Sequence, residues 1–451
     1  MAIEATDQRA PRLRLLRDAL ESGTLRRVQR MINSLHPAEI ADLLESLPPA
    51  EREVVWELVD TQIDGDVLVQ LNEEVRAKLL GDMDFDEMVA AAGNMDLDDL
   101  ADLVPDLPEA VSRQVIQSMD QQDRERLRSV MAYGEDTAGG LMDPDIVTVR
   151  PDVTLEVVLR YLRIRGELPD GSDALFVVNR FDRYIGYLYL TSLLTADPGK
   201  TVAELMDSGV DGIPAATSAN EVANLFEIRD LVTAPVVDPD GRLVGRITID
   251  DVVDVIREEA EHSILSMAGL AEDEDMFAPV VTSSRRRAVW LGVNLATAFV
   301  AASVVGLFQA TIDQVVALAV LMPIVASMGG IAGSQTLTLI VRGLALGQVQ
   351  SSNARWLMFR ELAVGALNGL VWALVVAAAT VLWFKSWILG GIIALALIIN
   401  LVVAALSGVL IPLVLRRMSI DPALAGSVVL TTITDVVGFM VFLGLGALLL
   451  T

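Results

Sequence analysis

The chain has 451 residues, enough for about three domains, with 61 acidic and 34 basic residues and a formal net charge of −27. This balance argues against nucleic acid or anionic lipid as the main partner. With no cysteine and only two histidines, the chain cannot form disulfides or thiolate metal sites and is poorly suited to bind transition metals. Binding sites for hard cations with oxygen ligands are compatible with this composition.

The negative charge is concentrated before Ser284, where 57 acidic and 25 basic residues give a formal net charge of −32. A surface of this kind is typical of a cation-responsive region, although a merely soluble acidic surface has the same composition. The first residues are charged and lack the apolar core of a signal peptide.

Residues 1–134 are predicted to form a cytosolic α-superhelical domain. Short segments begin at an acidic residue or a proline and continue with a stripe of Leu and Val, which indicates stacked short helices with the stripes as their core. This pattern identifies no chemistry. The expected helices are Arg12–Glu21, His36–Leu44, Pro49–Asp60, Gly65–Leu80, Asp96–Leu103 and Pro108–Met131.

An internal repeat follows. Val177–Leu194 aligns without a gap with Val236–Val253, and each copy reads as strand, turn, strand and helix. This order resembles a tandem pair of CBS domains, predicted at 135–200 and 201–261. The resemblance implies sensing of an adenine nucleotide, such as ATP, or of a regulatory ion, and a purely structural dimerisation unit is the alternative.

The second repeat ends in a dense set of acids. Asp250, Asp254 and Glu258 recur every four residues and share one helix face, so their charges repel. A bound divalent cation or a cationic partner would relieve the repulsion, whereas a solvated charged face is the usual alternative. Residues 262–284 are predicted to connect this helix to the membrane as a plug helix.

Residues 285–451 are predicted to form a transmembrane pore domain. Basic residues occupy alternate loops, which by the positive-inside rule places the acidic domains in the cytosol and Thr451 outside a multi-pass cell-membrane protein. The expected spans are 288–310, 314–341, 357–383, 388–414 and 424–450.

The last span carries one charged residue, Asp435, near its middle. An intramembrane carboxylate normally faces a bundle interior or a wet pathway because lipid does not solvate it. Ser427, Thr431 and Gly438 fall on the same helix face, which predicts the wall of a cation pore. A protonated aspartate within a tightly packed bundle is the alternative.

The second span contains a proline followed by Gly329, Gly330 and Gly333. Glycines allow close helix packing, and a kink among small residues can also expose carbonyl groups to a water-filled path. The glycines are therefore candidates for lining the pore, with packing alone as the alternative.

Taken together, this order of domains resembles the MgtE family of magnesium channels over essentially the whole chain. Three stretches carry the resemblance: Gly139-Gly-Leu-Met142, Gly329-Gly-x-x-Gly-x-Gln335, and Arg416-Arg-x-x-x-Asp-Pro-Ala423 followed by Asp435. The implied fold is a mainly α membrane protein with five spans, preceded by the α-superhelical domain and the α/β CBS pair.

The resemblance implies a homodimeric, Mg²⁺-selective channel in the lipid bilayer that closes when cytosolic Mg²⁺ binds acidic sites between the helical and CBS domains. Asp435 would be the central pore carboxylate and Asp421 an acid at the cytosolic mouth. The implied sensing acids are Asp66, Asp98, Asp102, Glu221, Asp230, Asp251, Asp254 and Glu259.

The chain departs from the family pattern at Ile331 and Ser427, where the family usually has Asn, and at His262 and Ser263, where it tends to have acids. We expect Mg²⁺ conduction with weaker Mg²⁺-dependent closure. A transporter of Co²⁺ or Mn²⁺ and a membrane-anchored nucleotide sensor are the rival interpretations. An enzyme is disfavoured because the sequence lacks a phosphate loop, a nucleophile elbow and a His/Cys catalytic set.

Overall fold

The computed structural model describes residues 25–450, apart from 94, 96, 170, 271–274, 351 and 419. The helix predicted at Arg12–Glu21 therefore lies outside the described residues. The chain forms two compact units: the first comprises the chain up to Glu259 together with Asp273–Ala278, and the second comprises Ala260–Glu272 together with Pro279–Thr451.

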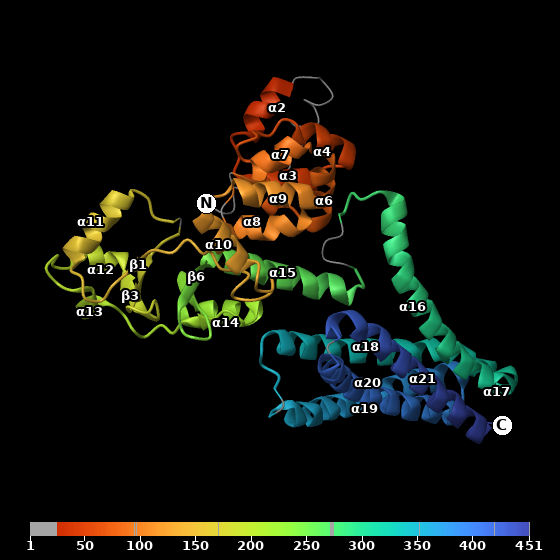
Figure 1. Cartoon of the computed structure of the whole chain (residues 1–451). Coiled ribbons are helices and arrows are strands. Elements are labelled where there is room, and N and C mark those ends of the chain that lie inside the picture. Colours follow the sequence, from red (N-terminus) through yellow and green to blue (C-terminus); the bar gives the residue numbers. More distant parts are fainter. Residues whose placement is uncertain are drawn as a thin grey trace. The chain divides into compact units, whose positions relative to one another are not determined.

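The first unit begins with a stack of short helices (Figure 1). Leu and Val side chains of their stripes form one core, with Leu44, Leu68 and Leu103 almost fully buried. The stacked helices confirm the predicted superhelical domain. They are α2 (Leu25–Ile32), α3 (Pro37–Glu45), α4 (Pro49–Trp56), α5 (Asp64–Val69), α6 (Glu73–Asp82), α7 (Phe85–Ala92), α8 (Leu97–Leu103), the 3₁₀ turn η1 (Val104–Asp106), α9 (Glu109–Ser118) and α10 (Gln121–Val130).

The predicted extents of two helices, Gly65–Leu80 and Pro108–Met131, were wrong, because the structure has two shorter helices in each segment. The segment Gly65–Leu80 is divided between α5 and α6, and the Asn72 side chain accepts a hydrogen bond from the Val75 amide at 2.9 Å to begin α6. Asp120 caps α10 in the same way, accepting from the Asp123 amide at 2.8 Å. A capping side chain thus starts a new helix within an apolar pattern that continues across the break.

Two three-stranded sheets follow, with the same topology. In each, the first strand pairs parallel to the second and the second pairs antiparallel to the third. Val177 lies opposite Gly186 in one sheet and Val236 opposite Gly245 in the other, and the register shifts one residue later in both. The sheets contain β1 (Thr148–Val149), β2 (Ala174–Val178) and β3 (Tyr184–Tyr189), and β4 (Ile213–Pro214), β5 (Thr233–Val237) and β6 (Leu243–Thr248).

The helices of this region complete two CBS-like repeats, as the gapless sequence match predicted. The long last helix, α15, carries the acids that follow the second repeat and extends past the boundary between the two compact units. The helices are α11 (Leu155–Arg165), α12 (Leu190–Thr195), α13 (Val202–Leu205), α14 (Ala219–Arg229) and α15 (Ile249–Met267).

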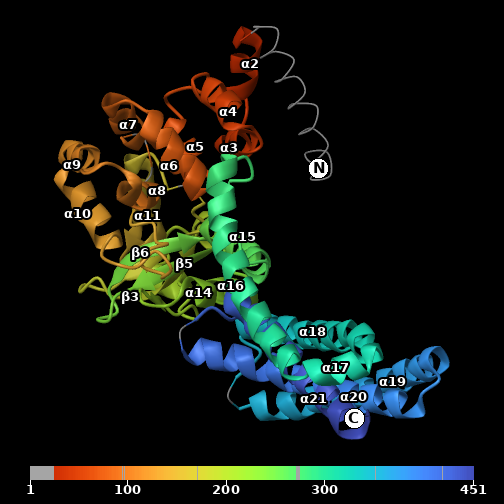
Figure 2. The same ribbon diagram turned by 90° about the vertical axis from the view of Figure 1, so that its right-hand side faces the viewer.

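Five helices in the described part of the second unit are long and apolar enough to cross a membrane, which confirms the predicted five-span fold. Their ends differ from the predicted ends by up to eight residues, and a short helix, α17 (Gln309–Gln314), joins the first two (Figure 2). The spans are α16 (Val280–Leu307), α18 (Val316–Ala345), α19 (Ala354–Phe384), α20 (Trp387–Arg417) and α21 (Pro422–Leu450).

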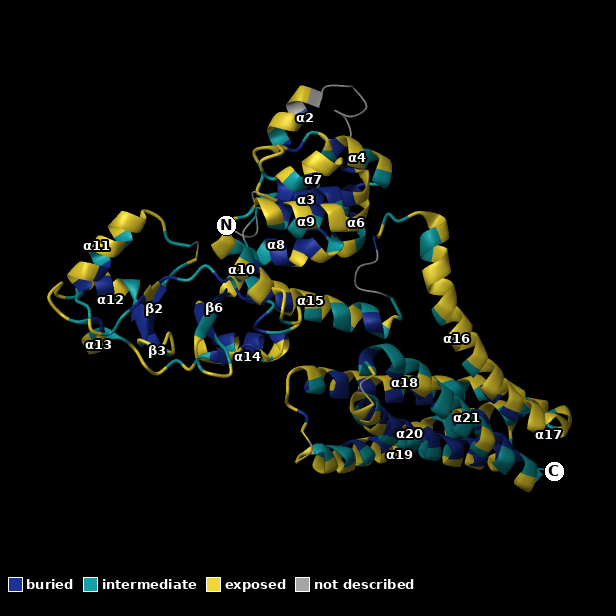
Figure 3. Cartoon of the chain, in the orientation of Figure 1, coloured by how far each residue is buried: buried dark blue, intermediate teal, exposed yellow. Residues whose placement is uncertain are grey.

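Helix α20 is the most buried of the spans and packs against α18, α19 and α21, whereas α16 and α19 leave much of their surface exposed (Figure 3). Small residues allow these close approaches. A Cβ atom added at Gly365 of α19 would lie 2.7 Å from the Cβ of Ala405 on α20, and one added at Gly408 would lie 2.8 Å from the Cβ of Thr336 on α18. The bundle is thus organised around α20.

Candidate cation sites

Asp435 lies midway along α21, on a side of the helix that its own subunit leaves partly open. Its side chain is half-buried, Ser427 is half-buried and Thr431 is exposed, at intervals of four residues along one face. The Asp435 carboxylate has no hydrogen-bond or ion-pair partner among the described residues. The alternative of a carboxyl group hydrogen-bonded within a tight bundle therefore finds no donor in the described part of this subunit.

The candidate pore glycines separate into two groups. Gly329, Gly333 and Gly438 are buried within the bundle, since an added Cβ would lie 2.3 Å from Asn400 Nδ2, 2.8 Å from Leu430 Cδ1 and 2.8 Å from Asn400 Nδ2, respectively. Gly330 is half-buried and has nothing within 4 Å of an added Cβ. The structure thus places three of them at helix contacts and leaves Gly330 on an open face.

Asp421 precedes α21 and caps its N-terminus. Its Oδ1 accepts a hydrogen bond from the Ala423 amide at 2.9 Å, and its Oδ2 accepts one from the Leu424 amide at 3.0 Å. His262 Nε2, from the part of α15 that belongs to this unit, lies 3.5 Å from Asp421 Oδ2. The connecting segment therefore contacts the start of the last span through His262, one of the residues at which the chain departs from the family pattern.

In the first unit, the predicted sensing acids Asp98 and Asp251 lie close enough to affect each other's charge. One oxygen of Asp98, Oδ1, is enclosed and has no hydrogen-bond partner in the described structure. Burial, followed by the nearby carboxylates of Asp143, Asp99 and Asp251, raises the pKa of Asp98 to about 8. A carboxylate in this position is unfavourable until a proton or a cation neutralises it.

One further predicted acid, Asp102, joins Asp98 and Asp251 in this group. Partial burial, followed by the charge of Glu135, raises the pKa of Asp102 to about 6, although the residue remains exposed at the surface. Burial raises the pKa of Asp251 to about 6, against two hydrogen bonds from the amide and hydroxyl of Thr248 that favour its charged form. We call Asp98, Asp102, Asp143 and Asp251 the acidic cluster.

Comparison with known proteins shows the family to which this chain belongs. Residues 35–136 match the MgtE intracellular N domain, residues 138–199 and 202–258 match CBS domains, and residues 322–445 match the divalent cation transporter family MgtE. The chain is 32% identical over 440 residues to the magnesium transporter MgtE of Thermus thermophilus, covering 96% of this chain and 98% of the relative. The chain belongs to the MgtE family of magnesium transporters.

Further known proteins are similar to this chain. The magnesium transporter MgtE of Bacillus subtilis is 28% identical over 426 residues, which cover 94% of each chain. Among solved structures, the cytosolic domain of the Mg²⁺ channel MgtE in complex with ATP is 34% identical, with a TM-score of 0.48, and covers 53% of this chain and 98% of its own. The soluble part of a magnesium transporter is 20% identical, with a TM-score of 0.47, and covers 56% of this chain and 99% of its own.

Not all of the sensing acids suggested by the MgtE resemblance converge. Glu221 lies in the first turn of α14 and Asp230 follows its last residue, so that about 13 Å of helix separates them. Asp66 is half-buried on α5, Asp254 is exposed on α15, and the Glu259 Oε2 accepts a hydrogen bond from Asn220 at 3.0 Å. Within one subunit, Glu221 and Asp230 therefore lie at opposite ends of α14.

In this MgtE chain, no group of three or more acidic or histidine side chains among the described residues is arranged to hold a metal ion by itself. The enclosed Asp98 oxygen and its carboxylate neighbours are all hard oxygen donors, so the residues present suit Mg²⁺.

The sequence had not singled out Asp143 as a site residue. The Asp143 carboxylate accepts a hydrogen bond from Arg246 Nε at 3.0 Å and contributes to the raised pKa of Asp98 and of Asp251. A signal was present, since Leu141-Met-Asp143 recurs in the second repeat as Leu205-Met-Asp207. The recurrence indicated the repeat and not the chemistry of its aspartate.

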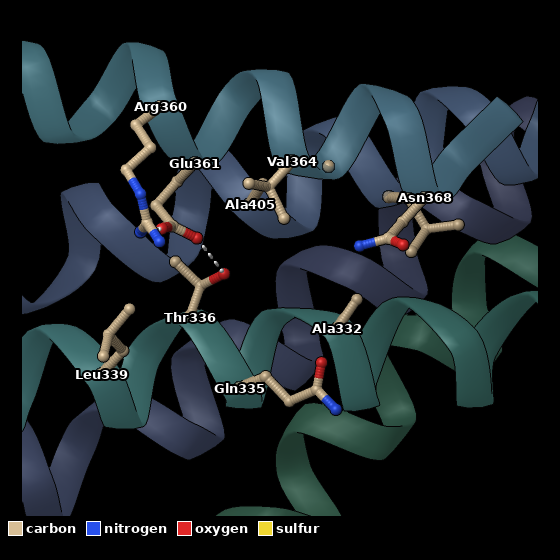
Figure 4. Close-up of a pocket in the computed structure, with 11 residues that line it drawn as sticks. Ala332, Gln335, Thr336, Leu339, Arg360, Glu361, Val364, Asn368 and Ala405 are labelled. Atoms are coloured by element: carbon tan, nitrogen blue, oxygen red, sulfur yellow. Dashed lines mark hydrogen bonds and ion pairs between the residues drawn. The ribbon is translucent and has the colours of Figure 1, made fainter. Parts of the chain in front are cut away.

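A second polar site within the membrane unit was also missed. Glu361 of α19 is 5% exposed, receives a hydrogen bond from Thr336 of α18 at 3.3 Å and pairs with Arg360. These side chains point into a pocket of about 220 Å³ between α18, α19 and α20 (Figure 4). Asp435 is not among the residues that line it, so this pocket is separate from the candidate pore face.

Proposed function

We propose that the protein is a Mg²⁺ channel of the cell membrane, formed by a homodimer whose pore runs between the two copies of α21. The carrying observation is that the Asp435 carboxylate, in the middle of a membrane span, has no partner among the described residues of its own subunit and lies on a partly open face. A second copy facing it would supply another carboxylate and a water-filled path between them.

Two facing carboxylates suit a magnesium ion. Mg²⁺ sheds water reluctantly and usually binds through one or two carboxylates while it keeps several waters. Ser427 and Thr431 continue the same face, and the Thr431 hydroxyl donates to the Ser427 carbonyl of its own helix at 3.0 Å, which leaves oxygen lone pairs for passing water. A wide site that holds the ion weakly also permits its release, which conduction requires.

The acidic cluster is the proposed Mg²⁺ sensor. Without the cation, Asp98 and Asp251 repel each other across the junction of the helical domain with the second CBS repeat, and Asp102 adds to the negative charge there. Bound Mg²⁺ would supply the positive charge that allows these domains to stay together, and preferential binding to this packed arrangement shifts the population towards the closed channel. Asp66, Glu221, Asp230, Asp254 and Glu259 remain proposed contributors at further sites.

The orientation of the protein is proposed from its charges. The acidic unit precedes the first span, so the loop with Arg342 and Arg355 and the loop that begins at Arg416 would lie on the same side of the membrane as that unit. The positive-inside rule assigns this side to the cytosol. With five spans, Thr451 would then lie outside. No catalytic role is proposed for any residue.

Binding of ATP by the CBS pair stays a prediction, as does selectivity for Mg²⁺ over Co²⁺ and Mn²⁺. Calorimetric titration of the purified full chain with ATP, in the presence and absence of Mg²⁺, tests the first. Competition of each divalent cation with Mg²⁺ in a flux assay tests the second. The spans contain no cysteine or histidine, which favours Mg²⁺.

The channel proposal is tested by Mg²⁺ flux into proteoliposomes that contain a Mg²⁺-sensitive dye. We expect Asp435→Asn to lose most of the flux, because the amide cannot neutralise a divalent ion, while Asp313→Asn, outside the spans on α17, retains it. Wild-type flux in Asp435→Asn would remove this residue from the pathway. A wild-type protein that gives no flux at any membrane potential would contradict the channel itself.

A further inference from the structure

Asn400 lies in the middle of α20 and is fully buried, with 0% of its surface exposed. Its side chain occupies the junction of three spans. A Cβ added at Gly329 of α18 would lie 2.3 Å from Asn400 Nδ2, and one added at Gly438 of α21 would lie 2.8 Å from the same atom. Both glycines therefore provide the space that this one amide fills.

The amide is bonded on one side only. Asn400 Nδ2 donates to the Val325 carbonyl of α18 at 2.9 Å, two residues beyond the proline within that helix. Asn400 Oδ1 is buried and has no partner among the described residues. A buried acceptor without a partner is unfavourable, and a leucine of similar shape would avoid it, so stability alone does not account for an asparagine here.

The position of this side chain connects it to the proposed pore. Gly438 follows Asp435 by three residues, about one turn of α21 or 4.5 Å along its axis. The same side chain therefore bonds to α18 and sets how closely α21 can approach. The shape and bonding of Asn400 are therefore coupled to the position of the helix that carries the Asp435 carboxylate.

We propose that Asn400 is a positioning residue of the ion pathway, which holds α18 and α21 in register so that Asp435 presents its carboxylate at the spacing a hydrated Mg²⁺ ion requires. The proposal rests on the proposed channel function and goes beyond it, since it assigns the affinity for Mg²⁺ to a residue that does not touch the ion. Groups that orient metal ligands commonly change metal affinity or activity about 10- to 100-fold when they are replaced.

The first test is Asn400→Leu, which keeps the branched shape and removes both the bond to Val325 and the unpaired oxygen. We expect the melting temperature of the purified protein to stay the same or rise, and the Mg²⁺ concentration for half-maximal flux to rise about tenfold or more. The control is Asn294→Leu, the same chemical change at an exposed position of α16, for which wild-type flux is expected. Unchanged affinity in Asn400→Leu, with intact folding, would overturn the proposal.

A second test separates positioning from simple filling of space. Gly438→Ala alone forces a methyl group against Asn400. The double variant Asn400→Ala/Gly438→Ala removes that clash but also lacks the amide. We expect the double variant to recover the melting temperature that Gly438→Ala loses, without recovery of Mg²⁺ affinity. If the double variant recovers both, Asn400 acts only by its volume.

Asp435→Asn distinguishes failure of this inference from failure of the proposed function. If Asp435→Asn abolishes flux while Asn400→Leu retains wild-type affinity, the channel proposal stands and the role of Asn400 does not. If Asp435→Asn transports normally, the pore assignment itself is wrong, and the positioning role falls with it.

Discussion

Arg52 and Asp275 form a buried ion pair between the helical domain and the segment that precedes the first span. Arg52 Nη1 donates to Asp275 Oδ2 at 2.8 Å, and Nη2 donates to Oδ1 at 3.1 Å. The two residues are 1% and 5% exposed. Since α16 begins at Val280, this pair fixes the chain to the helical domain five residues before that helix starts.

Removing one partner of this pair should destabilise the cytosolic unit strongly. Arg52→Met leaves the Asp275 carboxylate buried without its guanidinium partner, and we expect the free energy of unfolding to fall by about 3–5 kcal/mol. Thermal denaturation and hydrogen exchange at residues 275–278 measure the effect. The control is Arg113→Met, whose partner Glu109 is exposed and whose loss should cost less than about 1 kcal/mol. Equal melting of the two variants would contradict the prediction.

The acidic cluster predicts a specific dependence on pH. Because the folded pKa values of Asp98, Asp102 and Asp251 are raised, to about 8, 6 and 6, their protonated forms favour the folded state. Without Mg²⁺, this contribution is fully present below the unfolded pKa near 4 and is lost as pH rises through the folded values. Mg²⁺ competes with protons for the same oxygens, so we expect its stabilising effect to be larger at pH 8 than at pH 6.

Thermal melting of the full chain at both pH values, with and without Mg²⁺, measures this dependence. Asp98→Asn should raise the melting temperature without Mg²⁺ and reduce the shift that Mg²⁺ produces, while the exposed Asp82→Asn should do neither. A Mg²⁺-induced shift of equal size at pH 6 and pH 8 would mean that these carboxylates do not hold the cation.

Much of the fold could be predicted from the sequence because its signals are local. The five apolar runs set the spans, and the gapless repeat set the common register of the two sheets. Helix breaks at Asn72 and Asp120 were missed because a cap interrupts the backbone while the apolar stripe continues.

The candidate sites were less accessible to sequence reasoning, because their chemistry depends on tertiary contacts. Asn400 stands in an apolar run and gave no signal, and only the packed bundle shows that Gly329 and Gly438 provide space for it. The same limit applies to Glu221 and Asp230, which the family resemblance assigns to the second CBS repeat and which the structure places at opposite ends of α14.

The proposed dimer predicts which positions of α21 can be crosslinked. The chain contains no cysteine, so each introduced thiol is unique. We expect Thr431→Cys to give a product of about twice 48.6 kDa with a short bifunctional maleimide in native membranes. Val375 of α19 is also exposed, and Val375→Cys should remain monomeric. Crosslinking at Val375 and not at Thr431 would place the subunit interface on α19.

His262 offers a test of the predicted weak closure. It lies 3.5 Å from Asp421, and the family resemblance led us to expect an acid at position 262. His262→Glu would place a second carboxylate beside Asp421, and the repulsion between them is relieved when a divalent cation bridges the pair. We expect the cytosolic Mg²⁺ concentration for half-closure to fall by at least about fivefold, the lower range of typical coupling between sites. Currents from inside-out patches at graded Mg²⁺ concentrations measure it. Ile264→Glu adds the same charge on another face of α15 and serves as the control, and an equal shift in both variants would assign the effect to net charge and not to the contact with Asp421.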